Sequence, residues 1–366
     1  MKKWLLALAA LILFSLALFE YVSRGTHPQE SGTGVGAAHP TRLTTGGGGD
    51  LLVADDYHVF SVDSKSGGSE RILDTDGPIS SISYSADHTV VTVYNPNDQT
   101  SFRGLYIQDK QSKSFTPYPT PQWAPGRSYA FGDLLFVASA DRTVQQGNEM
   151  TKVGIFQLKE HRWVKEWLVP GGVEDVEGAG KDVYFVTSNN ASTSSNIYKA
   201  DLVTGEWGKL IQEARRYPLD QVSVDTNGDI YMMISQRHKS EWSNKIYKFN
   251  SQQVPYELAN NFVSNTKPYS YSMEALQGKM LINRYDVSHK TVDLEKPLAL
   301  LDLKSRKQVQ LAWDHRPVDV AAMGDRFAVL GEDGAVAIVA TDASEQPSRQ
   351  FQIEELTEAR TICAKK

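Results

Sequence analysis

The sequence has one cysteine, Cys363, among its 366 residues, so no disulfide can form within the chain. CxxC and CxxCH motifs are absent for the same reason, which excludes thiol redox, zinc–cysteine and covalent haem sites. The motifs GxSxG, GxxxxGK[ST] and HExxH are missing too. The eight histidines are scattered and form no pair at metal-ligand spacing. No cofactor is therefore predicted from motifs.

An excess of positive charge is also lacking, because the formal net charge is -6. An acidic surface repels phosphate groups, so it argues against nucleic acid, and against an anionic membrane surface, as the main partner.

The N-terminal residues 1–24 form a targeting segment. Lys2 and Lys3 precede an apolar run of sixteen residues, Trp4–Phe19. This length lies between the apolar core of a signal peptide and the about 20 residues of a spanning helix. Glu20–Arg24 offers no convincing small-residue cleavage pattern, which favours an uncleaved signal anchor, a single-pass helix in the cell membrane with the body on the extracytoplasmic side. A cleaved signal would instead give a secreted protein.

The stretch 25–39 is rich in Gly, Ser and Thr, which is typical of a flexible linker. Beyond it the chain consists of repeats. The segment Pro218–Leu258 has the alternating apolar pattern and Gly-containing turns of four short antiparallel strands. Such a unit cannot bury its own faces, so it must stack against copies of itself.

Prolines give the register of these copies, because a residue without a backbone N–H is confined to loops or to strand starts. The prolines that precede candidate first strands are Pro40, Pro78, Pro125, Pro170, Pro218, Pro268 and Pro317. The predicted first strands are 41–45, 79–84, 127–131, 173–178, 220–225, 269–274 and 318–322. The pattern predicts an all-β fold, a seven-bladed β-propeller of four-stranded antiparallel blades over 40–353. For the tail, 354–366, two structures remain open: a short helix, or pairing of Thr361–Ala364 with the first blade to close the ring.

The turns between third and fourth strands, as in Ile197–Trp207 and Phe60–Ile72, resemble those of YVTN-type, quinoprotein-like and kelch-like propellers. The segment Val222–Met233 is similar to the repeat core of the NHL class. The resemblance covers about Pro40 to Ile353 and implies the propeller fold. No single family's motif is met, so the resemblance carries no active site across.

Two short acidic stretches, Asp74–Gly77 and Asp225–Asp229, are similar to part of a calcium loop. Neither supplies the bidentate glutamate that ends such a loop. Because Asp, Asn and Gly form turns without a metal, both stretches are interpreted as turns.

The loops that precede first strands carry charges of both signs, and in propellers such loops line the mouth of the central channel. The candidate ligand-binding residues are Arg127, Asp175, Arg216, Asp220, Arg316 and Asp319. Asp175, Asp220 and Asp319 are the candidate ligands of a cation, for which calcium is possible, and the arginines would bind an anionic group. Alternatively, these are solvated charges that pair with one another at little energetic gain. The nearby Tyr269, Tyr271, Trp123 and Trp313 form either an aromatic wall or part of the core.

The sequence thus predicts a membrane-anchored, extracytoplasmic propeller that acts as a binding or scaffold module for an envelope protein, peptide or polysaccharide. An alternative is a lactonase- or lyase-like propeller enzyme with a cation at the channel mouth. A third is a structural subunit without a small-molecule site, which would expose an apolar patch on one face.

Overall fold

The computed structural model describes residues 48–98, 100–111, 114–189, 194–213, 219–238, 241–249, 255–260, 272–283, 296–356 and 358–365. The chain divides into two units, Met1–Pro40 and Thr41–Lys366, and every described residue belongs to the second. The predicted anchor, the linker and the predicted strand 41–45 therefore lie outside the described residues. Within the described part, no helix has the length and apolarity needed to cross a membrane.

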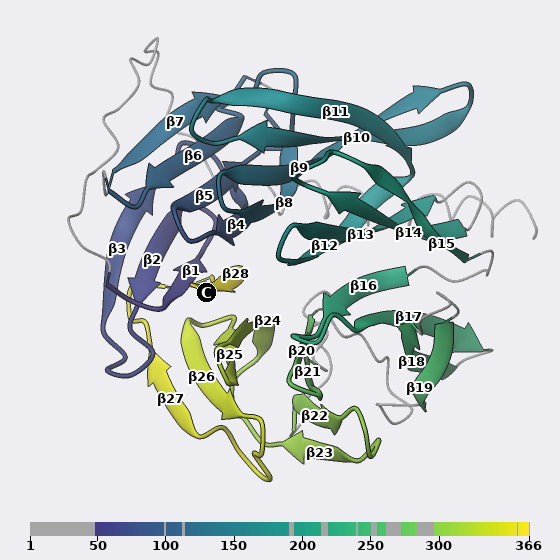
Figure 1. Cartoon of the computed structure of the whole chain (residues 1–366). Coiled ribbons are helices and arrows are strands. Elements are labelled where there is room, and N and C mark those ends of the chain that lie inside the picture. The colour runs from purple at the N-terminus through teal and green to yellow at the C-terminus, as the bar shows by residue number, and fades with distance from the viewer. Residues whose placement is uncertain are drawn as a thin grey trace, which may run out of the picture. The chain divides into compact units, whose positions relative to one another are not determined.

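The second unit consists of seven four-stranded antiparallel sheets, the blades of a β-propeller, arranged in a ring around a central axis (Figure 1). Blade 1 contains β28 (Thr361–Ala364), β1 (Leu51–Ala54), β2 (His58–Val62) and β3 (Ser69–Asp74). Blade 2 contains β4 (Ile79–Tyr84), β5 (His88–Val93), β6 (Gly104–Asp109) and β7 (Phe115–Pro119). Blade 3 contains β8 (Pro125–Phe131), β9 (Leu134–Gln145), β10 (Asn148–Gln157) and β11 (Arg162–Pro170). Blade 4 contains β12 (Gly172–Ala179), β13 (Asp182–Asn189), β14 (Ser194–Asp201) and β15 (Trp207–Glu213).

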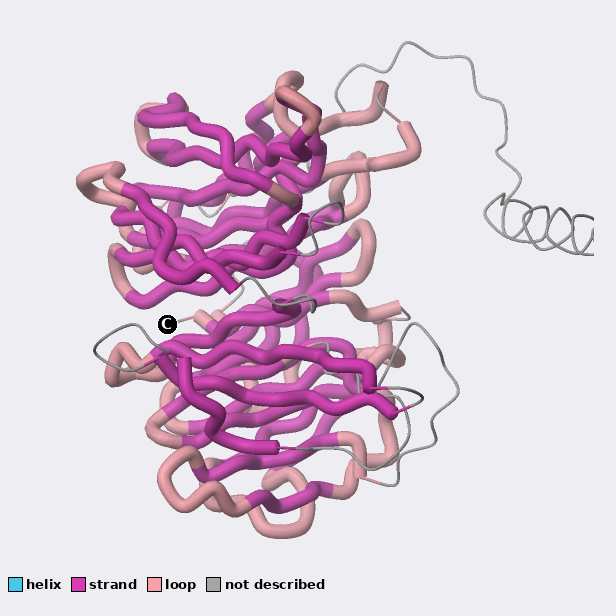
Figure 2. Tube along the Cα trace, turned by 90° about the vertical axis from the view of Figure 1, so that its right-hand side faces the viewer, coloured by secondary structure: helices cyan, strands magenta, loops and turns pink. Residues whose placement is uncertain are grey.

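The remaining three blades follow the same order. Blade 5 contains β16 (Leu219–Val224), β17 (Ile230–His238), β18 (Glu241–Phe249) and β19 (Pro255–Asn260). Blade 6 contains β20 (Met273–Leu276), β21 (Lys279–Asn283), β22 (Leu298–Asp302) and β23 (Gln308–Leu311). Blade 7 contains β24 (Pro317–Met323), β25 (Arg326–Gly331), β26 (Ala335–Ala340) and β27 (Arg349–Gln352). The side view of Figure 2 shows strands and loops as the only elements of the described chain.

The core lies between blades, and β5 shows how a middle strand is buried on both of its faces. All six residues of β5 are buried, and its side chains alternate between two neighbours. Val91 packs in a cluster with blade 1, and Val90 packs in a cluster with blade 3. Seven such apolar clusters of described residues fill the seven interfaces between adjacent blades. Stacking on both sides explains why a single repeat could not fold alone.

The ring is closed by the C-terminal strand. β28 pairs antiparallel with β1, with Leu51 opposite Ala364 and Ala54 opposite Thr361. Of the two structures predicted as alternatives for the tail, the observed one is therefore the pairing of Thr361–Ala364 with the first blade. The propeller does not end at Ile353 as predicted, because the innermost strand of blade 1 comes from the end of the chain.

The other predicted first strands agree with the innermost strands β4, β8, β12, β16, β20 and β24. In β20 the agreement covers only the end of the predicted range, since 269–271 lie outside the described residues. In this topology the innermost strands begin on one side of the ring, here called the entry face, and run to the other side, the exit face. The turns between second and third strands also lie on the entry face, because neighbouring strands are antiparallel.

Candidate functional site

Innermost strands carry a repeated irregularity near their start. In β4, β8, β12, β16 and β24 one extra residue interrupts the pairing with the second strand, which is a β-bulge. The bulged residues are Ser80, Gly126, Glu174, Asp220 and Val318. The residues directly after the bulge, which we call the axial ring, are Ser81, Arg127, Asp175, Gln221 and Asp319. Five blades thus place a polar side chain at the same position beside the axis.

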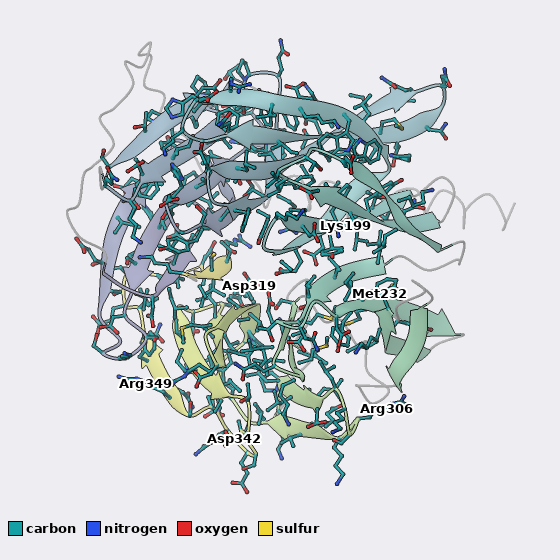
Figure 3. The ribbon with its side chains drawn as sticks, viewed as in Figure 1. Lys199, Met232, Arg306, Asp319, Asp342 and Arg349 are labelled. Atoms are coloured by element: carbon teal, nitrogen blue, oxygen red, sulfur yellow. The ribbon has the colours of Figure 1, made fainter. Side chains whose placement is uncertain are left out.

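Asp319 joins blade 7 to blade 1. Its Oδ1 accepts a hydrogen bond from the N–H of Val320, at 2.9 Å. Its Oδ2 accepts two bonds from β28, one from the N–H of Ile362 at 2.9 Å and one from the hydroxyl of Thr361 at 3.0 Å. Figure 3 shows Asp319 near the centre of the ring of blades. Burial raises the pKa of Asp319 to about 6, although the three donors favour the carboxylate.

Asp175 makes the same connection between blades 4 and 5. Its Oδ1 accepts from the N–H of Val176, and its Oδ2 accepts from the N–H of Val222 in β16, both at 2.9 Å. Burial again raises the pKa of this carboxyl above its usual range, against the effect of Arg127 and of the two N–H donors. Both aspartates therefore connect the innermost strands of adjacent blades through backbone N–H groups.

Arg127 belongs to the same electrostatic environment as both aspartates. Its positive charge lowers the pKa of Asp175 in the next blade and that of Asp319 in blade 7. The side chain is exposed, and within the described structure it forms no hydrogen bond or ion pair. The axial ring thus combines two anchored carboxylates with one cation that retains its hydrogen-bonding capacity.

The remaining predicted site residues have other positions. Asp220 is the bulged residue of β16, and Gln221 takes the axial position in that blade. The side chain of Asp220 and the whole of Arg216 lie outside the described residues. Arg316 precedes β24 and is exposed, with its Nη1 3.8 Å from Oε2 of Glu332. The similar spacing of Arg216–Asp220 and Arg316–Asp319 therefore does not produce equivalent aspartates.

The carboxylate oxygens at the axis are already hydrogen-bonded to the protein backbone. Each of the four carboxylate oxygens of Asp175 and Asp319 already accepts a backbone N–H. Calcium takes six to eight oxygen ligands. No group of three or more His, Cys, Asp or Glu residues suited to a metal occurs in the described part of the chain. A further acceptor near the axis, Oε1 of Gln221, is buried without a hydrogen-bond partner among those residues.

One residue with an inter-blade role was interpreted from sequence only as a turn former. Asp225 accepts from the N–H of Thr226 through Oδ1, and Gly228 has the positive φ of 82° expected in such a turn. Oδ2 of Asp225 also accepts from the N–H of Gly278 in blade 6, at 2.9 Å. Sequence spacing contains no signal for that second contact. Trp123 and Trp313, 2% and 3% exposed, belong to the core rather than to a binding wall, and Tyr269 and Tyr271 lie outside the described residues.

On the entry face, the β9–β10 hairpin extends past β8, because β8 pairs with β9 only as far as Ser139. Its turn is Gln146-Gly147, with positive φ at both residues, which is the tight hairpin turn that matches strand twist. The pairing of β9 with β10 is irregular between Thr151 and Val153, so the outer half of the hairpin begins at a bulge.

The base of this hairpin is held by both neighbouring blades. Asp141 accepts from the hydroxyl of Tyr94 at 3.1 Å and pairs with Arg103 at 3.3 Å, both in blade 2. Arg142 lies 3.3 Å from Glu174 in blade 4 and 3.4 Å from Glu149 across the hairpin. Opposite charges on two faces thus fix the base between blades 2 and 4.

A glycine makes room for this contact. A Cβ added to Gly172 would lie 2.2 Å from Nη2 of Arg142, so the guanidinium packs directly on the backbone at the start of β12. Glu174, which Arg142 contacts, is also bonded by the hydroxyl of Ser188 and immediately precedes Asp175. The hairpin base is therefore contiguous with the axial ring.

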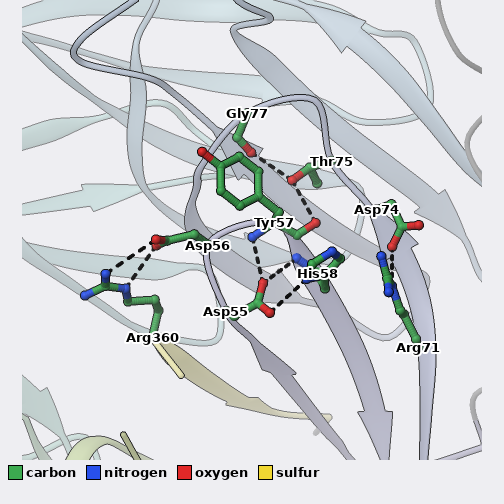
Figure 4. A network of polar contacts seen from close by, with 9 residues as sticks. All are labelled: Asp55, Asp56, Tyr57, His58, Arg71, Asp74, Thr75, Gly77 and Arg360. Carbon is green, nitrogen blue, oxygen red and sulfur yellow. Dashed lines mark hydrogen bonds and ion pairs between the residues drawn. The ribbon is translucent and has the colours of Figure 1, made fainter. Parts of the chain in front are cut away.

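The closing strand of blade 1 is fixed on the same face, as Figure 4 shows. Arg360, just before β28, pairs with both carboxylate oxygens of Asp56, at 3.0 and 3.4 Å. Asp55 accepts from the N–H groups of Tyr57 and His58, each at 2.7 Å. The hydroxyl of Thr75 donates to the carbonyl of Tyr57 at 3.1 Å. Tyr57, with 45% of its surface exposed, is presented to solvent by an ordered loop.

Comparison with solved structures identifies the same fold in several proteins. The chain is similar to the hydrazine synthase of Kuenenia stuttgartiensis at 13% identity and a TM-score of 0.58, covering 86% of this chain and 99% of that one. It is also similar to apo AztD from Citrobacter koseri, at 10% identity and a TM-score of 0.50, covering 86% and 97%. The fold is a seven-bladed β-propeller.

A third similar structure, the acylaminoacyl peptidase of Pyrococcus horikoshii, has 13% identity and a TM-score of 0.54 over 83% of this chain. The propeller described above spans about half the length of that protein, 50%. At such low identities these likenesses show the fold alone. No protein-family model matches the chain, and no curated protein matches it by sequence.

Proposed function

We propose that this protein is a binding or scaffold module that uses the entry face of its propeller to engage an envelope protein, a peptide or a polysaccharide. The observation that supports this function is that ion pairs fix the loops of the entry face beside a polar side chain that is available for hydrogen bonding. Ion pairs hold the β9–β10 hairpin and the Tyr57 loop in place, while the exposed Arg127 has no hydrogen-bond or ion-pair partner among the described residues. A preorganised surface loses less conformational entropy on binding.

Site-specific photo-crosslinking in cells would test this function. A photoreactive residue at Tyr57 is on the entry face, and one at Val203, which is 63% exposed in the turn between β14 and β15, is on the exit face. We expect a discrete crosslinked species from position 57 and none from position 203. Equal crosslinking from both positions, or from neither, would contradict the proposal.

The proposal includes anchoring in the cell membrane through residues 1–24, with the propeller on the extracytoplasmic side. The apolar run Trp4–Phe19 and the lack of a cleavage pattern support it. Mass spectrometry of the mature protein should find the N-terminal segment still attached. A mass lower by about two dozen residues would show a cleaved signal and a secreted propeller.

The second candidate is a lactonase- or lyase-like enzyme with a cation, such as calcium, at the axis. One observation favours it: burial raises the pKa of both Asp175 and Asp319, and a bound cation would stabilise the two carboxylates. Calcium should then raise the melting temperature relative to EDTA, and Asp175→Asn or Asp319→Asn should abolish the rise. Identical melting curves with calcium and EDTA would remove this candidate.

A further inference from the structure

The outer half of the β9–β10 hairpin has an unpaired edge. β10 pairs with β9 on one side as far as Gln145, whereas β8 covers the other side of β9 only up to Ser139. Ala140 still donates its N–H to the carbonyl of Ala124. From Arg142 to Gln145, however, this side of β9 has no strand partner among the described residues. Because β8 is the innermost strand of blade 3, the unpaired edge is the one on the axial side.

This edge is short and begins at a bulge, which are two of the features that protect exposed strands. It carries no proline, however, and no charge that is left unpaired among the described residues. Here Asp141 and Arg142 are already paired with blades 2 and 4, and the outer residues Thr143, Val144 and Gln145 are uncharged. Val144 is 73% exposed, the most exposed large apolar side chain of the described chain. In an antiparallel pair every second residue directs its N–H and C=O away from its partner strand. Backbone groups with no hydrogen-bond partner among the described residues therefore accompany an exposed valine.

We propose that this edge, Arg142–Gln145, accepts an extended, uncharged segment of a partner polypeptide as an added strand on the axial side of the hairpin. The inference deepens the proposed function, on which it rests, by naming a polypeptide rather than a glycan as the partner. A row of backbone N–H and C=O groups at strand spacing is matched in register only by another strand. The neutral edge selects an uncharged segment, because a charged side chain would find no opposite charge left free at this edge.

The size and position of the edge decide against a second copy of this chain as the partner. Four edge residues cover far less than the roughly 800 Å² per partner of a stable interface. Two identical hairpins paired at their tips would gain nothing more from the rest of the molecule. A partner segment can continue past Glu174 to the axial ring, since Arg142 contacts Glu174 and Asp175 follows it directly. The added strand would then lead its flanking residues towards Arg127.

The test uses the full-length protein in detergent micelles and a fluorescent, capped eight-residue peptide of alternating threonine and valine. The matched probe is the same peptide N-methylated at alternate residues, which removes the N–H donors of one edge. We expect fluorescence anisotropy to show binding of the first peptide and a loss of about tenfold or more in affinity on methylation. In the protein, Val144→Pro should weaken binding to a similar extent, whereas Val144→Thr, which retains the backbone N–H, should not.

Each outcome separates this inference from the proposed function. Equal affinities for both peptides, or for Val144→Pro and the unchanged protein, would overturn the added strand, as would no binding of either peptide. Binding that depends on Arg127, tested with Arg127→Gln, but not on Val144 would overturn the inference and leave an axial binding function in place. If light scattering shows a dimer that Val144→Pro dissociates, the edge serves a second copy, and the heterologous partner is refuted.

Discussion

At the scale of single residues, each of the two axial aspartates links adjacent blades by hydrogen bonds, although burial of its carboxylate charge is unfavourable. An aspartate directly after the bulge is short enough to accept from the next N–H of its own strand and from one in the neighbouring blade. Hydrogen bonds to a charged acceptor contribute about 1.5–3 kcal/mol each. Burial of the carboxylate opposes this gain, and for Asp319 it exceeds it, since the pKa rises to about 6.

The raised pKa of Asp319 predicts a particular pH dependence. The pKa of this carboxyl is about 6 in the folded protein and 3.8 ordinarily, so it stabilises the fold most at low pH, where the carboxyl is protonated in both the folded and the unfolded protein. Its contribution to the free energy of unfolding should therefore fall as pH rises from about 4 to about 6, by up to about 3 kcal/mol. Urea unfolding of the unchanged protein and of Asp319→Asn at several pH values would measure this difference. The exposed Asp342→Asn is the control, and parallel curves for Asp319→Asn would contradict the prediction.

Removing the acceptor at Asp175 predicts a loss of stability at neutral pH. Asp175→Ala leaves the N–H groups of Val176 and Val222 without their acceptor in a buried position. We expect the free energy of unfolding to fall by about 1–2 kcal/mol, because relief of the buried charge offsets part of the lost hydrogen bonds. Asp175→Asn keeps one acceptor oxygen and should lose less. A variant as stable as the unchanged protein would mean that the connection between β12 and β16 contributes nothing.

At the scale of the strand, the sequence predicted where the innermost strands lie but not where they contain β-bulges. The proline register placed the innermost strands β4, β12 and β24 within a residue or two, because a residue without an N–H is excluded from the paired interior of a blade and is found in loops, at strand starts and in edge strands. It did not predict the bulges. A bulge depends on pairing with the next strand rather than on alternation within one strand. Asp220 and Asp319 therefore seemed equivalent by their spacing from a proline, although Gln221 is the residue in the axial position.

The β9–β10 hairpin gives a prediction about local order. Arg142 joins the hairpin to Glu174 of blade 4 and pairs with Glu149 across the hairpin, but partly exposed ion pairs contribute only about 0.2–1 kcal/mol. Arg142→Ala should leave the melting temperature nearly unchanged, while amide hydrogen exchange at Thr143–Gln145 becomes faster. Arg326→Ala, which removes an exposed pair with Asp325 on the exit face, is the matched control. Unchanged exchange in the hairpin would show that the tight Gln146-Gly147 turn alone orders it.

At the scale of the whole molecule, the repeat pattern predicts the number of blades but not which strand closes the ring. Period, strand composition and turn residues predicted seven blades, because each blade is a local unit. The strand that closes the ring comes from about three hundred residues away, and Thr361–Ala364 has no proline mark or neighbouring repeat. Only the unmatched edge of the first blade could suggest it. The axial ring could be listed in part from sequence, but the hydrogen bonds from Thr361 and Ile362 to Asp319 depend on that closure.

Deleting residues 361–366 should therefore affect the entire propeller rather than one blade. The deletion removes the partner of β1, the acceptor contacts of Asp319 with β28, and Ile362 and Ala364 from the cluster between blades 7 and 1. We expect a lower melting temperature and exposure of the β1 edge, which promotes association between chains. Arg360→Ala is the matched control: it removes only the ion pair with Asp56 and should cost about 1 kcal/mol or less. Thermal unfolding with size-exclusion chromatography would measure both variants. If the deletion variant stayed monomeric and melted with the control, closure by β28 would contribute nothing to the stability of the ring.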